Sequence, residues 1–211
     1  MVCASNSNVD YRFQKVLQTC GAKDTSLFIR DANYHLLDRF VQMCTPSFEY
    51  PRSDGPETLI FAGGLPAGLR DPSPNLPAWW GDVTSKGDKK VIFVAQGTVS
   101  MDPNDLIIPT MLAFQDRDEI IVVVALGKKG ITLPEGTLVP NNARVADFLP
   151  YDEILEFTDC FVSNGGYGAI QHGLGHGVPQ LVAGVDADKA ENCARVGYVL
   201  PYSKISIEAL F

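Results

Sequence analysis

The stretch from residue 161 to residue 196 decides the fold of this chain. It reads Phe161-Val162-Ser163, then Asn164-Gly165-Gly166-Tyr167-Gly168, then Ala169-Ile170-Gln171-His172-Gly173-Leu174-Gly175-His176-Gly177-Val178-Pro179. A second apolar run at 180–184 leads to Val185-Asp186-Ala187-Asp188-Lys189-Ala190-Glu191-Asn192. This order predicts a strand, a glycine turn, a helix, a second strand, a turn and a second helix.

The glycine turn has the features of an anion site. Gly165, Gly166 and Gly168 allow the backbone to approach a ligand closely. A helix that begins just after them directs its unpaired N–H groups and its positive dipole end to the same point, which favours a phosphate or pyrophosphate. Gln171 stands where a dinucleotide fingerprint has its third glycine, and no Lys-Ser or Lys-Thr follows as in a P-loop. A tight turn without a ligand remains the alternative.

The composition is that of an acidic globular chain. Its 211 residues are 45% hydrophobic and 20% charged, and the formal net charge is -8. The acidic balance argues against non-specific nucleic-acid binding, which needs clustered Lys and Arg. Five scattered cysteines without a CxxC pair indicate a reducing compartment and no metal cage. Without a signal region or a run of about 20 apolar residues, we expect a cytoplasmic protein with no membrane span.

Residues 1–75 carry the weakest pattern. We expect short helices at 9–19 and 34–43 and a strand at 58–62. Residues 64–77 hold four prolines, which is typical of a linker. Trp79 and Trp80 follow this linker, and we expect them to anchor it by packing.

From residue 90 onward, short apolar runs alternate with helix-like segments. The predicted buried strands lie at 90–95, 119–126, 143–148, 159–163 and 180–184, and the intervening helices at 104–114 and 151–157. Such alternation indicates an α/β fold with a parallel sheet covered on both faces. Ligands of these sheets bind beyond the carboxyl ends of the strands. Four loops are expected there and should share one site, at Gln96, Phe148, Asn164 and Asp186.

Three further groups of residues allow both a functional and a structural interpretation. His172 and His176 have a spacing that can bind metal, but no HExxH glutamate or third ligand accompanies them, so we favour histidines on the helix surface or lining the site. Asp186 and Asp188 precede the last helix, and at least one of them is expected to cap it. The turn at 96–98 carries little information alone.

Taken together, the motifs resemble the donor half of UDP-dependent glycosyltransferases of the inverting GT-B family. The motifs are Gly165-Gly166 after a strand, Gly177-Val178-Pro179, and Asp188-Lys189 followed by Glu191-Asn192 and Arg195-Val196. The chain looks most similar to the fungal and actinobacterial branch, which has Asn-Gly-Gly in place of His-Gly-Gly. The resemblance covers about residues 46–196, and the segments 46–52 and 61–65 resemble the end of the family's acceptor domain.

The resemblance implies a role for each matching position. It places the pyrophosphate on a turn made of Asn164, Gly165, Gly166, Tyr167, Gly168 and Ala169, and near Gln96, Gly97 and Thr98. The base would lie against Phe148, Leu149 and Pro150, the ribose near His172, and the sugar hydroxyls at Asp188 and Lys189. No metal or other cofactor is implied, because the UDP-sugar is itself the donor substrate.

Three departures from the family pattern affect these roles. Asn164 stands in place of the His that contacts the phosphate, so a donor is kept and a possible positive charge is lost. His172 replaces the Glu that binds the ribose. The family's catalytic His, near the start of its acceptor domain, has no counterpart here. We therefore expect a fragment or truncated product of a larger enzyme, inactive in transfer by itself.

These observations predict two domains and one parent function. Residues 1–75 would be a remnant of the acceptor domain with its linker, and residues 76–211 a Rossmann-like domain that binds the UDP-sugar. The function would be hexosyl transfer to a hydroxyl of a small-molecule acceptor, held by the missing domain. The alternatives are a non-catalytic nucleotide-binding or regulatory module, and a UDP-sugar epimerase of the same fold. The epimerase is disfavoured because Asp188-Lys189 aligns better with transferases.

Overall fold

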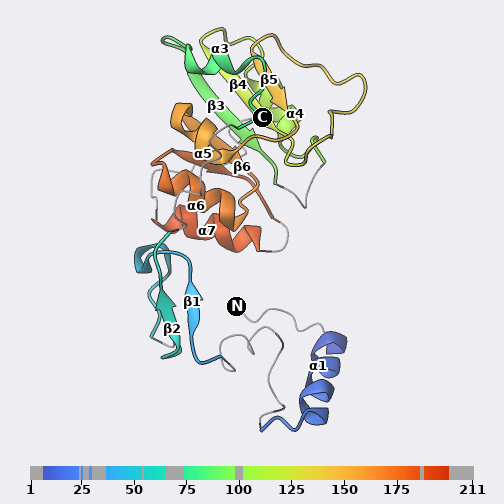
Figure 1. Ribbon diagram of the computed structural model, residues 1–211, viewed down its shortest axis with the longest axis vertical. Coiled ribbons are helices and arrows are strands. Elements are labelled where there is room, and N and C mark those ends of the chain that lie inside the picture. The colour runs from blue at the N-terminus through green and yellow to red at the C-terminus, as the bar shows by residue number, and fades with distance from the viewer. Residues whose placement is uncertain are drawn as a thin grey trace. The chain divides into compact units, whose positions relative to one another are not determined.

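The computed structural model describes residues 7–23, 25, 29, 37–53, 55–64, 74–97, 102–185 and 188–199. The chain divides into two compact units, Met1–Gly63 and Gly64–Phe211 (Figure 1). This division falls upstream of the expected boundary at 75/76, and residues 65–73 of the expected linker lie outside the described residues. None of the described helices is long and apolar enough to cross a membrane.

The first unit contains a helix and a pair of parallel strands. α1 (Ser7–Thr19) and β2 (Leu59–Phe61) confirm the helix and strand predicted there. β1 (Phe40–Gln42) pairs in parallel with β2, and η1 (Pro46–Phe48) follows it. The helix predicted at 34–43 is wrong over Phe40–Gln42, because this segment pairs with β2 instead of bonding along a helix; residues 34–36 lie outside the described part.

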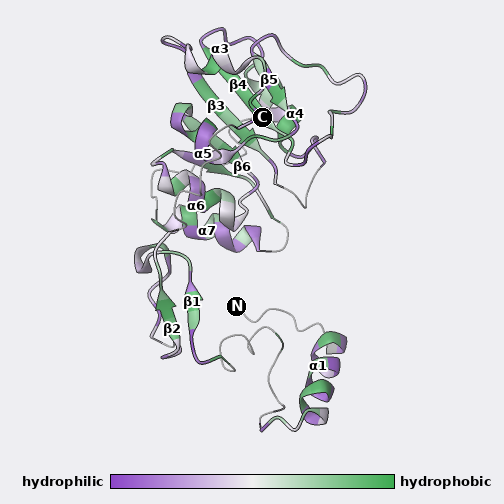
Figure 2. Ribbon diagram, in the orientation of Figure 1, coloured by the Kyte–Doolittle hydropathy of each residue, from purple (hydrophilic) through white to green (hydrophobic). Residues whose placement is uncertain are grey.

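The second unit is built on a five-stranded parallel sheet. Its strands are β3 (Lys90–Ala95), β4 (Ile120–Ala125), β5 (Ala143–Ala146), β6 (Cys160–Ser163) and β7 (Gln180–Val182). They lie in the order β5-β4-β3-β6-β7, and every neighbouring pair is parallel. The sequence-based prediction of an α/β fold is confirmed, with all five strands in place. Figure 2 shows that β3 and β4 are almost wholly hydrophobic, as expected of strands buried on both faces.

One helix precedes the first strand of this sheet, and others follow β3, β5, β6 and β7. They are α3 (Trp80–Thr84), α4 (Ile107–Ala113), α5 (Tyr151–Ile154) continued by η2 (Leu155–Phe157), α6 (Tyr167–Gly175) and α7 (Lys189–Val199). Side chains of β3 alternate between the two faces of the sheet. Val91 and Phe93 enter one hydrophobic cluster, whereas Ile92 and Val94 enter the other, so both faces are covered.

Trp79 and Trp80 pack against the first of these clusters, as predicted. Trp79 Nε1 donates to the carbonyl oxygen of Val145 at 3.3 Å. The Trp80 ring meets Phe157 edge-on, with centroids 5.9 Å apart. The two indoles thus attach the start of the second unit to the sheet and to η2; α3, which begins at Trp80, was not predicted.

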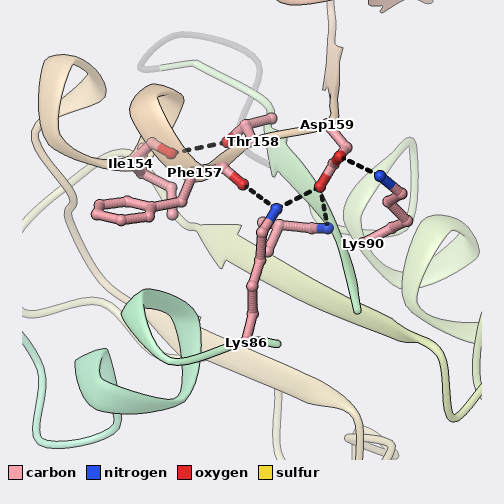
Figure 3. Close-up of polar contacts among 7 residues, drawn as sticks. Lys86, Lys90, Ile154, Phe157, Thr158 and Asp159 are labelled. Atoms are coloured by element: carbon pink, nitrogen blue, oxygen red, sulfur yellow. Dashed lines mark hydrogen bonds and ion pairs between the residues drawn. The ribbon is translucent and has the colours of Figure 1, made fainter. Parts of the chain in front are cut away.

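The amino end of the sheet is tied together by Asp159 (Figure 3). Lys86 Nζ lies 2.5 Å from one carboxylate oxygen and Lys90 Nζ lies 3.0 Å from the other. The backbone N–H of Val91 also donates to this carboxylate, at 2.9 Å. Partial burial raises the pKa of Asp159, but the hydrogen bonds from Lys86, Val91 and Lys90 outweigh it and lower the pKa to about 2. This cluster of charged side chains connects the amino ends of β3 and β6.

Candidate functional site

The carboxyl ends of β3 and β6 meet at the centre of the sheet, where the strand order reverses. Taken in chain order, the strands lie 3-2-1-4-5, which makes β3 and β6 neighbours. Ala95 pairs with Ser163, so the turns that follow the two strands lie side by side. Doubly wound sheets bind their ligands in the crevice at such a reversal. The structure therefore brings the predicted turns at Gln96 and Asn164 together.

Asn164 joins these two turns directly. Its side-chain Nδ2 donates a hydrogen bond to the main-chain oxygen of Gln96. Both residues are buried, with 8% of Asn164 and 2% of Gln96 exposed. The Gln96 amide donates in turn to the carbonyl oxygen of Asp102 at 2.5 Å, and its Oε1 is buried without a hydrogen-bond partner. Asn164 thus uses a donor inside the protein, a role that its family position did not predict.

Two glycines let the turns after β3 and β4 approach each other. Gly97 and Gly127 both have φ of 88°, in the left-handed region that favours glycine. A Cβ atom on Gly127 would overlap the carbonyl oxygen of Gly97. Backbone therefore packs on backbone at this end of the sheet. Thr98, the third residue of the predicted turn, lies outside the described residues, as does Asp186.

Gly165 is glycine because the fold requires it. Its φ is 78°, and a Cβ atom here would lie 2.7 Å from Cys193 Sγ. Gly184, just after β7, faces the same turn, because a Cβ atom there would overlap the carbonyl oxygen of Asn164. The turn after β6 thus packs between the segment that follows β7 and the first half of α7.

Gly166 and Gly168 have no comparable structural reason to be glycine. Gly166 has φ of −62° and ψ of 138°, which any residue adopts, and an added Cβ would make an ordinary contact 3.7 Å from Asn164 Oδ1. A Cβ on Gly168 would meet no atom within 4 Å. Both glycines lie at the start of α6, where the first N–H groups have no partner within the helix. The open backbone here has the geometry that an anion needs.

The other two residues of this turn, Tyr167 and Ala169, are half-buried. Tyr167 is the first residue of α6. Ala169 packs against the hydrophobic cluster that contains Phe93 and Phe161. The side chain of Ala169 thus supports α6, so any contact of Ala169 with a ligand would be made by its backbone.

Asp188 is connected to the glycine turn through Asn192. The buried Asn192 Nδ2 donates to the carbonyl oxygen of Gly165 at 3.1 Å and to Asp188 Oδ2 at 2.9 Å. The backbone N–H of Asn192 also bonds to the carbonyl oxygen of Asp188 at 3.0 Å, so Asp188 occupies the N-cap position of α7. The exposed Asp188 therefore occupies the N-cap of α7, and its carboxylate is held in place relative to the glycine turn by Asn192. Figure 1 shows α6 and α7 next to each other.

Lys189, the first residue of α7, lies against the same turn. Its side chain is buried, and a Cβ on Gly184 would lie 2.8 Å from Lys189 Cδ. A Cβ on Gly165 would lie 3.9 Å from Lys189 Cβ. The aliphatic stem of Lys189 therefore runs past both of these glycines.

His172 on α6 and His176, the residue that ends this helix, share one carboxylate on α5. His172 Nδ1 lies 2.9 Å from Asp152 Oδ1, and His176 Nε2 lies 3.8 Å from the same oxygen. Tyr151 meets His172 edge-on, with centroids 5.5 Å apart, and burial raises the pKa of Tyr151 to about 12. Among the described residues, no group of three His, Cys, Asp or Glu side chains could hold a metal ion. His172 is thus half-exposed and oriented by Asp152.

The predicted base-binding loop follows β5. Phe148 is 43% exposed, and Lys129 Nζ lies 5.6 Å from the centre of its ring. Asp147 accepts the Gly130 N–H at 2.6 Å, and this bond contributes most to lowering the pKa of Asp147. Leu149 is 1% exposed and belongs to the core, so its side chain cannot line a site. Of the three residues predicted to meet the base, Phe148 is exposed, Pro150 is half-buried and Leu149 is buried, so the Phe148 ring offers the largest surface to a ring-shaped ligand.

Sequence reasoning missed residues that position the site from a distance. Asn192 was recognised as part of a motif and had no role assigned, although its spacing of four residues from Asp188 on a helix is a usable signal. Gly127, Asp152 and Gly184 gave no local signal, because their partners Gly97, His172 and Asn164 are distant in sequence.

Known proteins match this chain across the site. A family model described as the erythromycin biosynthesis protein CIII-like, C-terminal domain, matches residues 110–200. UDP-glucosyltransferase B1 of Starmerella bombicola is 43% identical over 175 residues, 81% of this chain and 40% of that protein. UDP-glycosyltransferase 2 of Phaeomoniella chlamydospora is 38% identical over 192 residues, 88% of this chain and 41% of that protein. The chain belongs to the UDP-glycosyltransferases. It spans less than half the length of these relatives.

Solved structures agree with this family. The glycosyltransferase of kitacinnamycin superposes with a TM-score of 0.64 at 26% identity, covering 89% of this chain and 46% of that chain. The calicheamicin glycosyltransferase CalG4 superposes with a TM-score of 0.60 at 18% identity, covering 88% of this chain and 44% of that one, and supports the fold alone. The predicted fold, a Rossmann-like parallel sheet that forms the C-terminal half of a GT-B fold, is therefore confirmed.

Proposed function

We propose that the second unit binds a UDP-sugar, with UDP-glucose as the donor, for hexosyl transfer to a hydroxyl of a small-molecule acceptor. One observation carries this proposal. Gly166 and Gly168 leave the backbone open at the start of α6, which follows β6 at the point where the strand order reverses, although neither packing nor backbone geometry requires glycine there. An anionic ligand that approaches this backbone explains both residues.

The pyrophosphate is proposed to lie on the turn from Asn164 to Ala169, with Gln96, Gly97 and Thr98 on its other side. The backbone N–H groups and the positive dipole end of α6 then stabilise the charge that develops on the departing UDP. This stabilisation requires the two turns to stay in register. The hydrogen bond from Asn164 to Gln96 supports that requirement.

Recognition of the sugar and the nucleoside is proposed to come from three side chains. Asp188 reads the sugar hydroxyls, because a carboxylate accepts bonds from two neighbouring hydroxyls and Asn192 holds it relative to the turn. The exposed ring of Phe148 packs on the base. His172 contacts the ribose from α6, with Asp152 fixing the orientation of its ring.

The acceptor and the cellular compartment are further parts of the proposal. The relatives named UDP-glucosyltransferases are more than twice as long as the matched segment, so the acceptor is proposed to be held by residues outside the second unit. Cys20, Cys44, Cys160 and Cys193 are free thiols, which supports action in a reducing compartment such as the cytoplasm.

Incubation of the purified chain with labelled UDP-glucose and a hydroxyl acceptor, followed by product analysis, tests the proposal. Binding of UDP-glucose together with formation of a glycoside supports a transferase. An epimerised sugar nucleotide would assign an epimerase instead. Binding without any product is the result expected of this chain alone, which is predicted to be inactive in transfer, and it supports the donor site only. Absence of UDP-glucose binding would reject the donor site itself.

A further inference from the structure

The Lys129 ammonium lies over the ring that the proposed function assigns to the base. Its Nζ is 5.6 Å from the centre of the Phe148 ring, and Phe148 is 43% exposed. The two residues follow the carboxyl ends of neighbouring strands, Lys129 after β4 and Phe148 after β5. A cation over the face of an aromatic ring is attracted by the negative charge density of that face. A flat ligand that stacks on Phe148 must therefore meet the Lys129 ammonium.

The backbone around Lys129 is fixed relative to Phe148 by one carboxylate. Gly130 N–H donates to Asp147 Oδ2 at 2.6 Å, and the N–H of Phe148 donates to Asp147 Oδ1 at 2.7 Å. On the other side of Lys129, the backbone of Gly127 packs on the turn after β3. The turn that carries Lys129 is thus connected directly to the residue whose ring the ammonium covers.

An ammonium at this place discriminates between bases by the groups on their edges. It has three N–H donors and no acceptor. Uracil and cytosine share the carbonyl at ring position 2 and differ at position 4, where uracil has a carbonyl oxygen and cytosine an amino group. The carbonyl oxygen can accept a hydrogen bond from the ammonium, whereas the amino group presents only further N–H donors to it. Stacking on the Phe148 ring does not make this distinction, because every base has a flat face.

We propose that Lys129 recognises the base of the donor nucleotide by donating a hydrogen bond to the 4-carbonyl oxygen of a uracil stacked on Phe148. The inference rests on the proposed function, which it deepens by assigning a residue that selects the base. The base takes the place of the ammonium on the ring face, and the long Lys129 side chain meets the edge of the base. Lys129 is thus a determinant of base identity and not of sugar identity.

Calorimetric titrations with UDP, CDP, uridine and inorganic pyrophosphate test this role. The wild-type chain should bind UDP about tenfold more tightly than CDP, a factor that one hydrogen bond from a charged donor can supply. Lys129→Met keeps an unbranched stem and removes the ammonium. It should weaken UDP and uridine by about tenfold and leave CDP and pyrophosphate nearly unchanged. Lys128→Met, which removes the exposed charge of the adjacent residue, is the matched control and should keep the preference for UDP over CDP.

A double-mutant cycle with Phe148→Ala shows whether the two side chains act on the same base. Phe148→Ala should fold, because the ring is exposed, and should weaken UDP by loss of stacking. In that background Lys129→Met should have little further effect on UDP, because a base that is not stacked is not held beside the ammonium. Independent, additive losses from the two substitutions would place Lys129 away from the base and overturn the proposal.

Each other result has a definite meaning. Equal losses of UDP and pyrophosphate in Lys129→Met would assign the lysine to the diphosphate, and equal losses of UDP and CDP would make it unselective; unchanged UDP affinity would leave it no role in the site. All three overturn the inference while the proposed function stands, as does a wild-type chain that binds UDP and CDP equally well. A wild-type chain that binds neither UDP nor uridine would instead overturn the proposed function, and this inference with it.

Discussion

Asn164 Nδ2 donates a hydrogen bond to the main-chain oxygen of Gln96, and this buried bond joins the turns after β6 and β3. The two turns follow Ser163 and Ala95, which are paired in register in the sheet. The two strands are thus paired up to their carboxyl ends, and this side-chain hydrogen bond continues the connection into the candidate site.

Asn164→Ala should destabilise the protein and weaken UDP binding. The change leaves the buried carbonyl of Gln96 without its donor, which costs about 1–3 kcal/mol. Urea denaturation of the wild type and the variant measures this loss. Asn141→Ala, at an exposed asparagine, is the control and should stay within about 0.5 kcal/mol of the wild type. A similarly small effect at Asn164 would show that the two turns do not depend on this bond.

Gly165 and Gly166 should respond differently to substitution, although they are adjacent. Gly166→Val should fold, because the backbone at Gly166 is extended and an added Cβ would make only an ordinary contact with Asn164, and it should weaken UDP by more than about tenfold, or roughly 1.4 kcal/mol. Gly165→Val should lower stability instead, because its φ is 78° and its Cβ would meet Cys193. Thermal unfolding and UDP titration of both variants separate the two effects. Unchanged UDP affinity in folded Gly166→Val would remove the phosphate from this turn.

Asp188→Asn should weaken UDP-glucose and spare UDP. If the carboxylate binds sugar hydroxyls, its loss costs about 1.5–3 kcal/mol of affinity for the sugar nucleotide. As an N-cap, asparagine serves about as well as aspartate, so the fold should persist. Titrations with both ligands decide the matter, with Glu191→Gln, at an exposed position on α7, as the control. Equal shifts for the two ligands would mean that Asp188 does not read the sugar.

The Asp159 cluster should make stability depend on pH in the acid range. The pKa of Asp159 is about 2 in the folded protein, lowered from 3.8, because hydrogen bonds from Lys86, Val91 and Lys90 outweigh its burial. A lowered folded pKa contributes stability that is fully present above about pH 4 and is lost as the pH falls towards 2. Melting curves of wild type and Asp159→Asn across this range should therefore converge as the pH falls. A constant difference between them would exclude this contribution.

Apolar runs and turn residues were sufficient to predict the sheet. The run from Lys90 to Ala95 is short, β-branched and almost without polar residues, and it is β3 as predicted. The spacing of apolar residues near Phe40 is typical of a helix, yet Phe40–Gln42 is a strand that pairs with Leu59–Phe61. Pairing between distant segments overrode the local pattern there. The order of the strands in the sheet could not be predicted from the sequence either, because periodicity identifies single elements and not which strands lie side by side.

The candidate site was only partly predictable for the same reason. The glycine turn and Asp188 could be identified because their signals are local or belong to a recognised motif. The link between them, Asn192, depends on a carbonyl of Gly165 that is 27 residues away. The orientation of His172 similarly depends on Asp152, on another helix. Composition and spacing do not encode such contacts, so the structure was needed to connect the predicted residues.

A calorimetric titration of UDP into the wild-type chain tests the central claim most directly. The open turn at Gly166 and Gly168 and the helix N-terminus behind it together predict saturable binding of one UDP per chain. UDP-glucose should compete for the same site. Absence of UDP binding at millimolar concentrations, by a chain shown to be folded, would contradict the account.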